Sequence, residues 1–128
     1  MGLVFKCSPE PDNVGLYDCP VTVSLRDSVY LVSDDAVDQA DATSLATMPV
    51  IGMVRLKPTA TSCVVQYAGE LDGFSGLIAG STYYQDLVSG DITDTPPSSP
   101  GEVLQRLGFA KSSGTLVVQV DRDIIVIS

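Results

Sequence analysis

One stretch of this sequence occurs twice, and that duplication limits the folds open to the chain. Val23–Tyr30 aligns without gaps on Leu77–Tyr84, with an apolar start, a small or turn-forming middle and an aromatic end in both copies. An apolar-Gly-apolar step follows each copy, centred on Gly52 and Gly108, at an offset of 56 residues against 54 for the first stretch. A sequence period of this size indicates a repeated structural unit.

A third landmark closes each copy. The run Val64-Val65-Gln66 returns as Val117-Val118-Gln119, at an offset of 53 residues, so the order of landmarks survives small changes in loop length. Chance similarity between Val-rich strands and Gly turns is the alternative. We therefore expect two tandem pseudo-repeats, over about residues 21–68 and 75–128.

The short apolar segments are typical of strands rather than helices. They are rich in Val, Ile and Tyr and are separated by Gly, Pro, Asp and Ser, which favour turns. Asp41 to Met48 is the one stretch with helical spacing, and Pro49 limits it to one or two turns. We predict an all-β antiparallel sandwich or barrel. Its strands are expected over residues 21–25, 29–32, 50–56, 63–67, 82–86, 103–110, 115–120 and 124–127.

The length of 128 residues is that of one domain. Residues 1–20 contain several prolines and no periodicity, so we expect an N-terminal arm there and a β domain over 21–128. Residues 95–101 hold three prolines, which excludes a central strand and predicts a surface loop or a second arm. Such arms can reach a neighbouring subunit, although a plain surface loop is the simpler interpretation.

Charge excludes several classes of partner. The chain has 16 acidic and 7 basic residues, a formal net charge of -9, which disfavours nucleic acid and anionic membrane surfaces. Charged residues make up only 18% of the chain, where about 25% is typical. Part of the surface is therefore expected to be covered by partner subunits, with a monomer that has a rich core as the alternative. No run of apolar residues is long enough for a transmembrane helix.

The N-terminus lacks the long apolar stretch of a signal peptide, so we expect synthesis and retention in a reducing cytoplasm. There Cys7, Cys19 and Cys63 act as small hydrophobic residues. A Cys7–Cys19 bridge in an oxidising setting stays open.

Nothing in the sequence predicts catalysis, a cofactor or a metal. The chain has no histidine, which removes the commonest general base and metal ligand. The acidic residues near Asp34 lack the spacing of a calcium loop and are interpreted as a solvated turn. Asp121 and Asp123 flank Arg122, which indicates a local ion pair rather than a pair of catalytic carboxylates. A small hydrolase or isomerase that uses carboxylates alone would need two of them to converge in a pocket.

Several motifs resemble small virion proteins of tailed bacteriophages. They are Ser28-Val29-Tyr30-Leu31, Met48-Pro49-Val50-Ile51-Gly52, Gly76-Leu77-Ile78-Ala79-Gly80-Ser81-Thr82-Tyr83-Tyr84, Thr95-Pro96-Pro97 and Gln105-Arg106-Leu107-Gly108-Phe109-Ala110. The order resembles that in head decoration (cement) proteins and in tail-fibre segments, and it covers roughly residues 20 to 120. Gly, Pro and aromatic residues at these spacings indicate a fold more specifically than they indicate a function.

The resemblance implies a non-enzymatic capsid protein on the virion surface. Its expected partners are the lattice of the major capsid protein and further copies of itself, as a homotrimer. A receptor- or glycan-binding module of a tail fibre is the alternative. The residues expected at interfaces are Val4, Phe5, Pro9, Pro11, Leu16, Tyr17, Pro96, Pro97, Ile124, Ile125, Val126 and Ile127.

Overall fold

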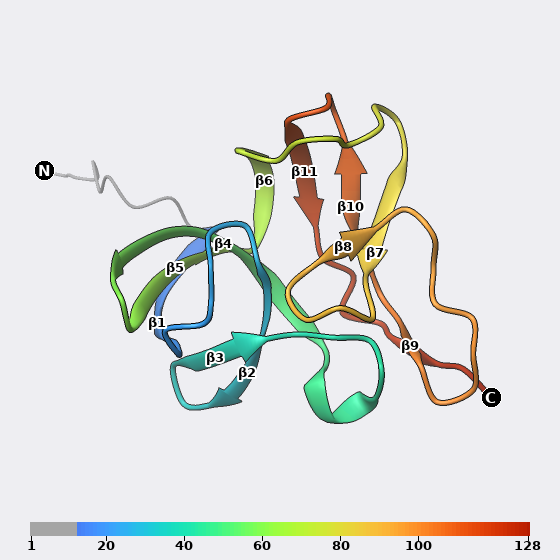
Figure 1. Cartoon of the computed structure of the whole chain (residues 1–128), viewed down its shortest axis with the longest axis horizontal. Coiled ribbons are helices and arrows are strands. Elements are labelled where there is room, and N and C mark those ends of the chain that lie inside the picture. The colour runs from blue at the N-terminus through green and yellow to red at the C-terminus, as the bar shows by residue number, and fades with distance from the viewer. Residues whose placement is uncertain (1–12) are drawn as a thin grey trace, which may run out of the picture.

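A computed structural model describes residues 13–128, which form an all-β fold with a single turn of 3-10 helix (Figure 1). The prediction of an all-β chain is confirmed. The elements are β1 (Val14–Asp18), β2 (Ser28–Ser33), β3 (Ala36–Gln39), η1 (Leu45–Thr47), β4 (Val50–Thr59), β5 (Ser62–Gln66), β6 (Ala68–Asp72), β7 (Thr82–Gln85), β8 (Ile92–Thr93), β9 (Val103–Leu104), β10 (Arg106–Ala110), β11 (Thr115–Gln119) and β12 (Ile125–Val126).

The first five strands form a closed barrel in the order β1-β3-β2-β4-β5. We call these strands the first repeat. All but one of the pairings are antiparallel. The barrel is closed by a parallel contact in which Asp18 faces Ala36, supported by a 2.8 Å hydrogen bond from Asp18 N to Asp35 O. Figure 1 shows the barrel on the left of the molecule.

The second repeat has the same strand order but stays open. Its strands run β6-β11-β10-β7-β8, and the first repeat, read from β1, runs β1-β5-β4-β2-β3. The predicted duplication is therefore present in the topology. The strand that opens each repeat, β1 or β6, precedes the stretch in which the duplication is recognised in the sequence. A separate two-stranded sheet pairs β12 with β9.

The two repeats share a β-bulge at the same place. The matching pairs are Val29–Gly52 and Tyr30–Val50 in the first repeat, and Tyr83–Gly108 and Tyr84–Arg106 in the second. Ile51 and Leu107 are the extra residues. Glycine is needed next to them, because a Cβ on Gly52 would collide with the carbonyl oxygen of Gln66, and one on Gly108 with that of Val117. The apolar-Gly-apolar landmark thus marks a bulge against a neighbouring backbone.

The turn before this strand pair is also duplicated. Arg26 N donates to Val54 O at 2.7 Å, and Gly80 N, 54 residues later, donates to Ala110 O at 2.8 Å. Both residues have positive φ, +72° at Arg26 and +87° at Gly80. Left-handed backbone is easy for glycine and costly for other residues, so Arg26 is held there by its surroundings.

The side chains of Arg26 and Gln66 occupy the free edge of the second sheet. Gln66 Nε2 donates to the carbonyl oxygens of Ala68 and Glu70, both at 3.0 Å, and Arg26 Nε donates to that of Asp72. These acceptors lie along β6, which pairs with β11 on its other side. Side chains of the first repeat thus cover the edge that β3 covers in the barrel, and they protect it from strand pairing.

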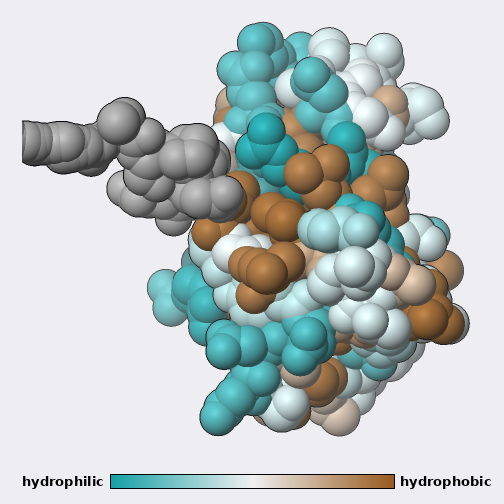
Figure 2. Space-filling view, turned by 90° about the vertical axis from the view of Figure 1, so that its left-hand side faces the viewer, coloured by the Kyte–Doolittle hydropathy of each residue, from teal (hydrophilic) through white to brown (hydrophobic). Residues whose placement is uncertain are grey.

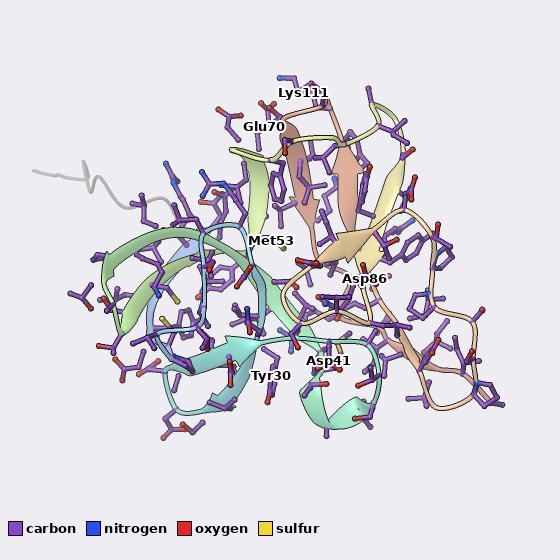
Figure 3. All side chains as sticks on the ribbon, in the orientation of Figure 1. Tyr30, Asp41, Met53, Glu70, Asp86 and Lys111 are labelled. Atoms are coloured by element: carbon purple, nitrogen blue, oxygen red, sulfur yellow. The ribbon has the colours of Figure 1, made fainter. Side chains whose placement is uncertain are left out.

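The two repeats share one of two hydrophobic cores. One core lies inside the barrel and includes Val29, Val65 and Cys63. The other lies inside the second sheet, where Met53 and Val50 of the first repeat pack against residues such as Leu116. Met53 is fully buried and lies between the barrel and the second sheet (Figure 3). The first repeat therefore fills the interior that the second sheet leaves open.

Two expectations at the N-terminal end were wrong. Residues 21–25 form no strand, because Val23 N bonds to Pro20 O and Asp27 N to Ser24 O, which makes consecutive turns. Residues 14–18, expected in an irregular arm, form β1 and pair with β5 over all five positions. The predicted helical stretch is reduced to the three residues of η1.

Candidate interaction surfaces

A row of apolar side chains lies across the outside of the barrel. Leu16 on β1 and Leu56 on β4 each face Val64 on β5, so the three share one side of the sheet. Leu16 is 66% exposed and Leu56 is 55% exposed. We call these three residues the barrel face. On the side where β1, β4 and β5 lie, Figure 2 shows apolar surface bordered by hydrophilic residues.

The position of the second repeat that corresponds to Leu16 is charged. Glu70 faces Val117 as Leu16 faces Val64, and both repeats keep this register over five pairs. Glu70 forms an ion pair of 2.9 Å with Lys111 at the tip of the second sheet (Figure 3). A charged side chain is usual at such a solvent-facing position, so the exposed Leu16 of the barrel face is a departure from it.

A second exposed surface lies on the outside of β7 and β10. Tyr84, Arg106 and Phe109, here called the Tyr84 face, occupy the positions that Tyr30, Val50 and Met53 occupy in the first repeat. Phe109 is 38% exposed. A groove of about 270 Å³ runs beside Tyr84 and Arg106. Its other lining residues are Leu104, Asp121, Asp123 and Ile125.

A wider cleft of about 510 Å³ opens at the seam of the second sheet. Phe74 and Tyr83 contribute aromatic walls, and Arg26 and Asp91 contribute charge. Burial raises the pKa of the Asp91 carboxyl, and the nearby carboxylates of Asp86 and Asp27 raise it further. The hydroxyl of Tyr83 already accepts a 2.9 Å hydrogen bond from Ile78 N, which leaves this side chain a structural role.

The predicted interface residues fall into three groups. Val4, Phe5, Pro9 and Pro11 lie outside the described residues. Leu16 lies on the barrel face, whereas Tyr17 packs against the barrel core with its ring edge-on to Tyr67, at a centroid distance of 6.4 Å. Burial and a hydrogen bond to the Tyr67 hydroxyl raise the pKa of Tyr17.

The remaining predicted residues lie toward the C-terminal end. Pro96 and Pro97 are in the loop between β8 and β9, where Pro96 is exposed. Ile125 and Val126 form β12 and are 58% and 47% exposed. Ile124 instead packs against the shared core, and Ile127 N bonds to Glu102 O at 2.9 Å. The structure brings Ile125 next to the Tyr84 face and leaves the two prolines apart from that groove.

Two of the three cysteines lie among the described residues. Cys19 and Cys63 are free and buried in the barrel core, as expected for small hydrophobic residues. Burial, with a hydrogen bond to Cys19, raises the pKa of the Cys63 thiol to about 12. The predicted alternative of a Cys7–Cys19 bridge involves Cys7, which lies outside the described residues.

Two buried glutamines that sequence reasoning missed join the repeats. Gln105 accepts from Val50 N at 2.7 Å and donates to Val50 O at 2.9 Å, as a neighbouring strand would. Gln85 donates to Ala40 O at 2.9 Å and accepts from the Ser28 hydroxyl. Both side chains are at most 1% exposed. A polar residue between strand residues was the only signal in the sequence, and it does not distinguish a buried amide from an exposed one.

Between residues 13 and 128 the structure contains no helix long and apolar enough to cross a membrane. In the same part of the chain, no group of three or more acidic or cysteine side chains is arranged to hold a metal ion. No protein-family model matches the chain, and no curated protein matches it significantly.

Proposed function

We propose that this protein is a non-enzymatic structural component of a tailed-bacteriophage virion, a decoration protein that binds the assembled lattice of the major capsid protein. It would be made in the host cytoplasm and reside on the capsid surface. The observation that carries the proposal is the barrel face. Its apolar side chains lie on the outside of a closed barrel, and Leu16 occupies the position at which the second repeat has the charged Glu70.

A decoration protein acts through many weak contacts. A ligand that binds only the assembled shell stabilises it by mass action, and each added site contributes again. A small rigid apolar surface suits this role because its side chains need little ordering on binding. The low content of charged residues, 18%, is consistent with a surface that is partly covered in an assembly.

Capsids assembled without this protein provide the test. The purified chain is mixed with them, and the shells are imaged by electron cryomicroscopy. We expect added density at regular lattice points. The double variant Leu16→Glu/Leu56→Lys, which replaces the two exposed leucines of the barrel face by charged side chains, is expected to lose most of that density.

A matched control separates the barrel face from general surface hydrophobicity. Val21 is 67% exposed and lies outside the barrel face, so Val21→Thr should decorate shells as the unmodified chain does. Melting temperatures of both variants report whether the fold is kept. Decoration by the double variant at full occupancy, or failure of the unmodified chain to bind shells, would refute the proposal.

The cleft at the seam of the second sheet favours a second candidate, a receptor- or glycan-binding module of a tail fibre. Phe74 offers an aromatic wall, and Asp27 and Asp94 offer hydrogen-bond acceptors at the rim. Pockets that combine apolar walls with a few polar groups are typical ligand sites. Binding to host-cell surfaces or to a glycan panel that Phe74→Ala abolishes, together with no binding to shells, would favour this function.

A further inference from the structure

We propose that the Tyr84 face is a two-fold contact between two copies of this chain. The first repeat shows what this position is used for. There Val50 and Met53 are fully buried, because the second repeat packs on them. In the second repeat the equivalent residues, Arg106 and Phe109, are exposed.

The equivalence is fixed by strand register rather than by visual similarity. Ser28 faces Met53 in the first repeat, and Thr82 faces Phe109 in the second, with the shared bulge one step further along. The same side of the same two strands is thus covered in one repeat and open in the other. The side of β2 and β4 that packs against the second sheet has an exposed counterpart on β7 and β10.

Charge identifies the partner as a second copy. Arg106 lines the groove together with Asp121 and Asp123. Among residues 13–128 the structure contains one ion pair, between Lys111 and Glu70, so Arg106 forms none with these carboxylates. A two-fold contact requires a self-complementary surface, and a groove that carries both signs allows Arg106 of one copy to face the carboxylates of the other. Copies with a net charge of -9 repel one another elsewhere, so this pairing sets the orientation.

Apolar area next to the groove completes the surface. Ile125 lines the groove and is 58% exposed. It belongs to β12, which pairs with β9 along one edge. Two such surfaces face to face would remove Ile125 and Phe109 of both copies from water, and burial of apolar surface is the usual driving force for association.

The test is a solution mass measurement by analytical ultracentrifugation over a range of concentrations. We expect the mass of two chains, where one chain is 13.5 kDa. Arg106→Asp alone and Asp123→Arg alone should each weaken association roughly tenfold or more, because like charges then meet across the two-fold axis. An equimolar mixture of the two variants should regain the dimer, because each copy then offers the charge that the other needs.

The mixture distinguishes a contact between copies from a fault within one chain. If Arg106 acted only inside its own chain, mixing the variants would restore nothing. The control is Lys111→Asp, which makes the same change of charge at the Glu70 ion pair and should leave the mass unchanged. Circular dichroism and melting temperature verify that each variant is folded.

A monomer at all concentrations would overturn this inference. An oligomer that ignores the substitutions, or a mass of three chains as the phage resemblance leads one to expect, would overturn it too. The inference does not depend on the capsid proposal, because shell binding is absent from the assay and the barrel face is left intact.

Discussion

The two repeats share one strand order and one bulge, but they have different structural roles. The first closes into a barrel with its own core, and its outer side then becomes part of the interior of the second. The second stays open and exposes the side that the first one covers. The fold therefore contains two copies of one scaffold, and the difference between them arises from which copy covers the other.

The largest expected effect separates two equivalent side chains. Met53→Ala should cost about 2–5 kcal/mol in free energy of unfolding, because it leaves a cavity in the shared core. Phe109→Ala, at the matching position, should cost about 1 kcal/mol or less, because Phe109 is 38% exposed. Urea denaturation at concentrations where the chain is monomeric measures both. Equal costs would break the assignment of the two faces.

The bulge glycines should behave alike in both repeats. Gly52→Ala and Gly108→Ala each place a Cβ against a backbone carbonyl, so each should cost about 1–3 kcal/mol, near the upper end of that range. Gly76→Ala is the control, because no atom lies within 4 Å of its added Cβ and only the strain of positive φ remains. Thermal unfolding measures the three variants. A neutral Gly108→Ala would show that the second bulge is not tightly packed.

The amide that joins the repeats is the next test. Gln105→Leu removes the partner of Val50 N and Val50 O and should cost about 1–3 kcal/mol, because buried backbone groups are then left unpaired. Gln119→Leu, on the exposed end of β11, is the control and should be nearly neutral. If both substitutions were equally mild, the repeats would be held together by the shared apolar core alone.

Two carboxylates should respond to pH with opposite sign. Burial would raise the pKa of Asp41, but hydrogen bonds from Thr43, Thr47 and Ser89 outweigh this effect and lower the pKa. The pKa of Asp91 is instead raised by burial and by nearby carboxylates. Asp41 therefore stabilises the fold above its unfolded pKa, and this contribution is lost as the pH falls through its folded pKa. Asp91 destabilises the fold at neutral pH and ceases to do so as the pH falls through its raised pKa.

Melting temperatures across a pH series check both signs. At pH 7, Asp41→Asn should lower the melting temperature and Asp91→Asn should raise it. Both differences should fade at acid pH, once the two carboxyls of the unmodified chain are protonated. A rise for Asp41→Asn at pH 7 would contradict the hydrogen bonding described for that loop.

The smallest effect concerns the ion pair of the second repeat. Both side chains are more than half exposed, at 56% and 57%, so Glu70→Gln should change stability by less than about 0.5 kcal/mol. The comparison with the barrel face lies in solubility rather than stability. Glu70→Leu/Lys111→Leu should promote association at high concentration, which light scattering detects, while Glu70→Gln should not.

Much of the fold was predictable because its signals are local. Tyr30 and Tyr84, with Gly52 and Gly108, mark the same bulge in each repeat, and a bulge needs a small residue wherever it occurs. β1 was missed because its five residues follow a proline-rich stretch. The comparison Val14–Asp18 with Ala68–Asp72, VGLYD against AGELD, would have revealed it.

The candidate surfaces could be predicted from the sequence only in part. Leu16, Ile125 and Val126 were predicted at interfaces, and they are exposed. Arg106 and Phe109 were not, although they lie in the motif that carried the phage resemblance. Alternation along a strand assigns residues to two sides, but it does not say which side another part of the chain will cover.

By itself the sequence determined the all-β class, the duplication and the places where strands bend, because turn and strand preferences act over a few residues. The tertiary structure alone decided that one repeat closes and the other opens, and that Met53 is buried while Phe109 meets water. These outcomes depend on contacts between different strands and turns, such as that of Arg26 with Asp72 and that of Met53 with the core of the second sheet, and no local preference encodes them.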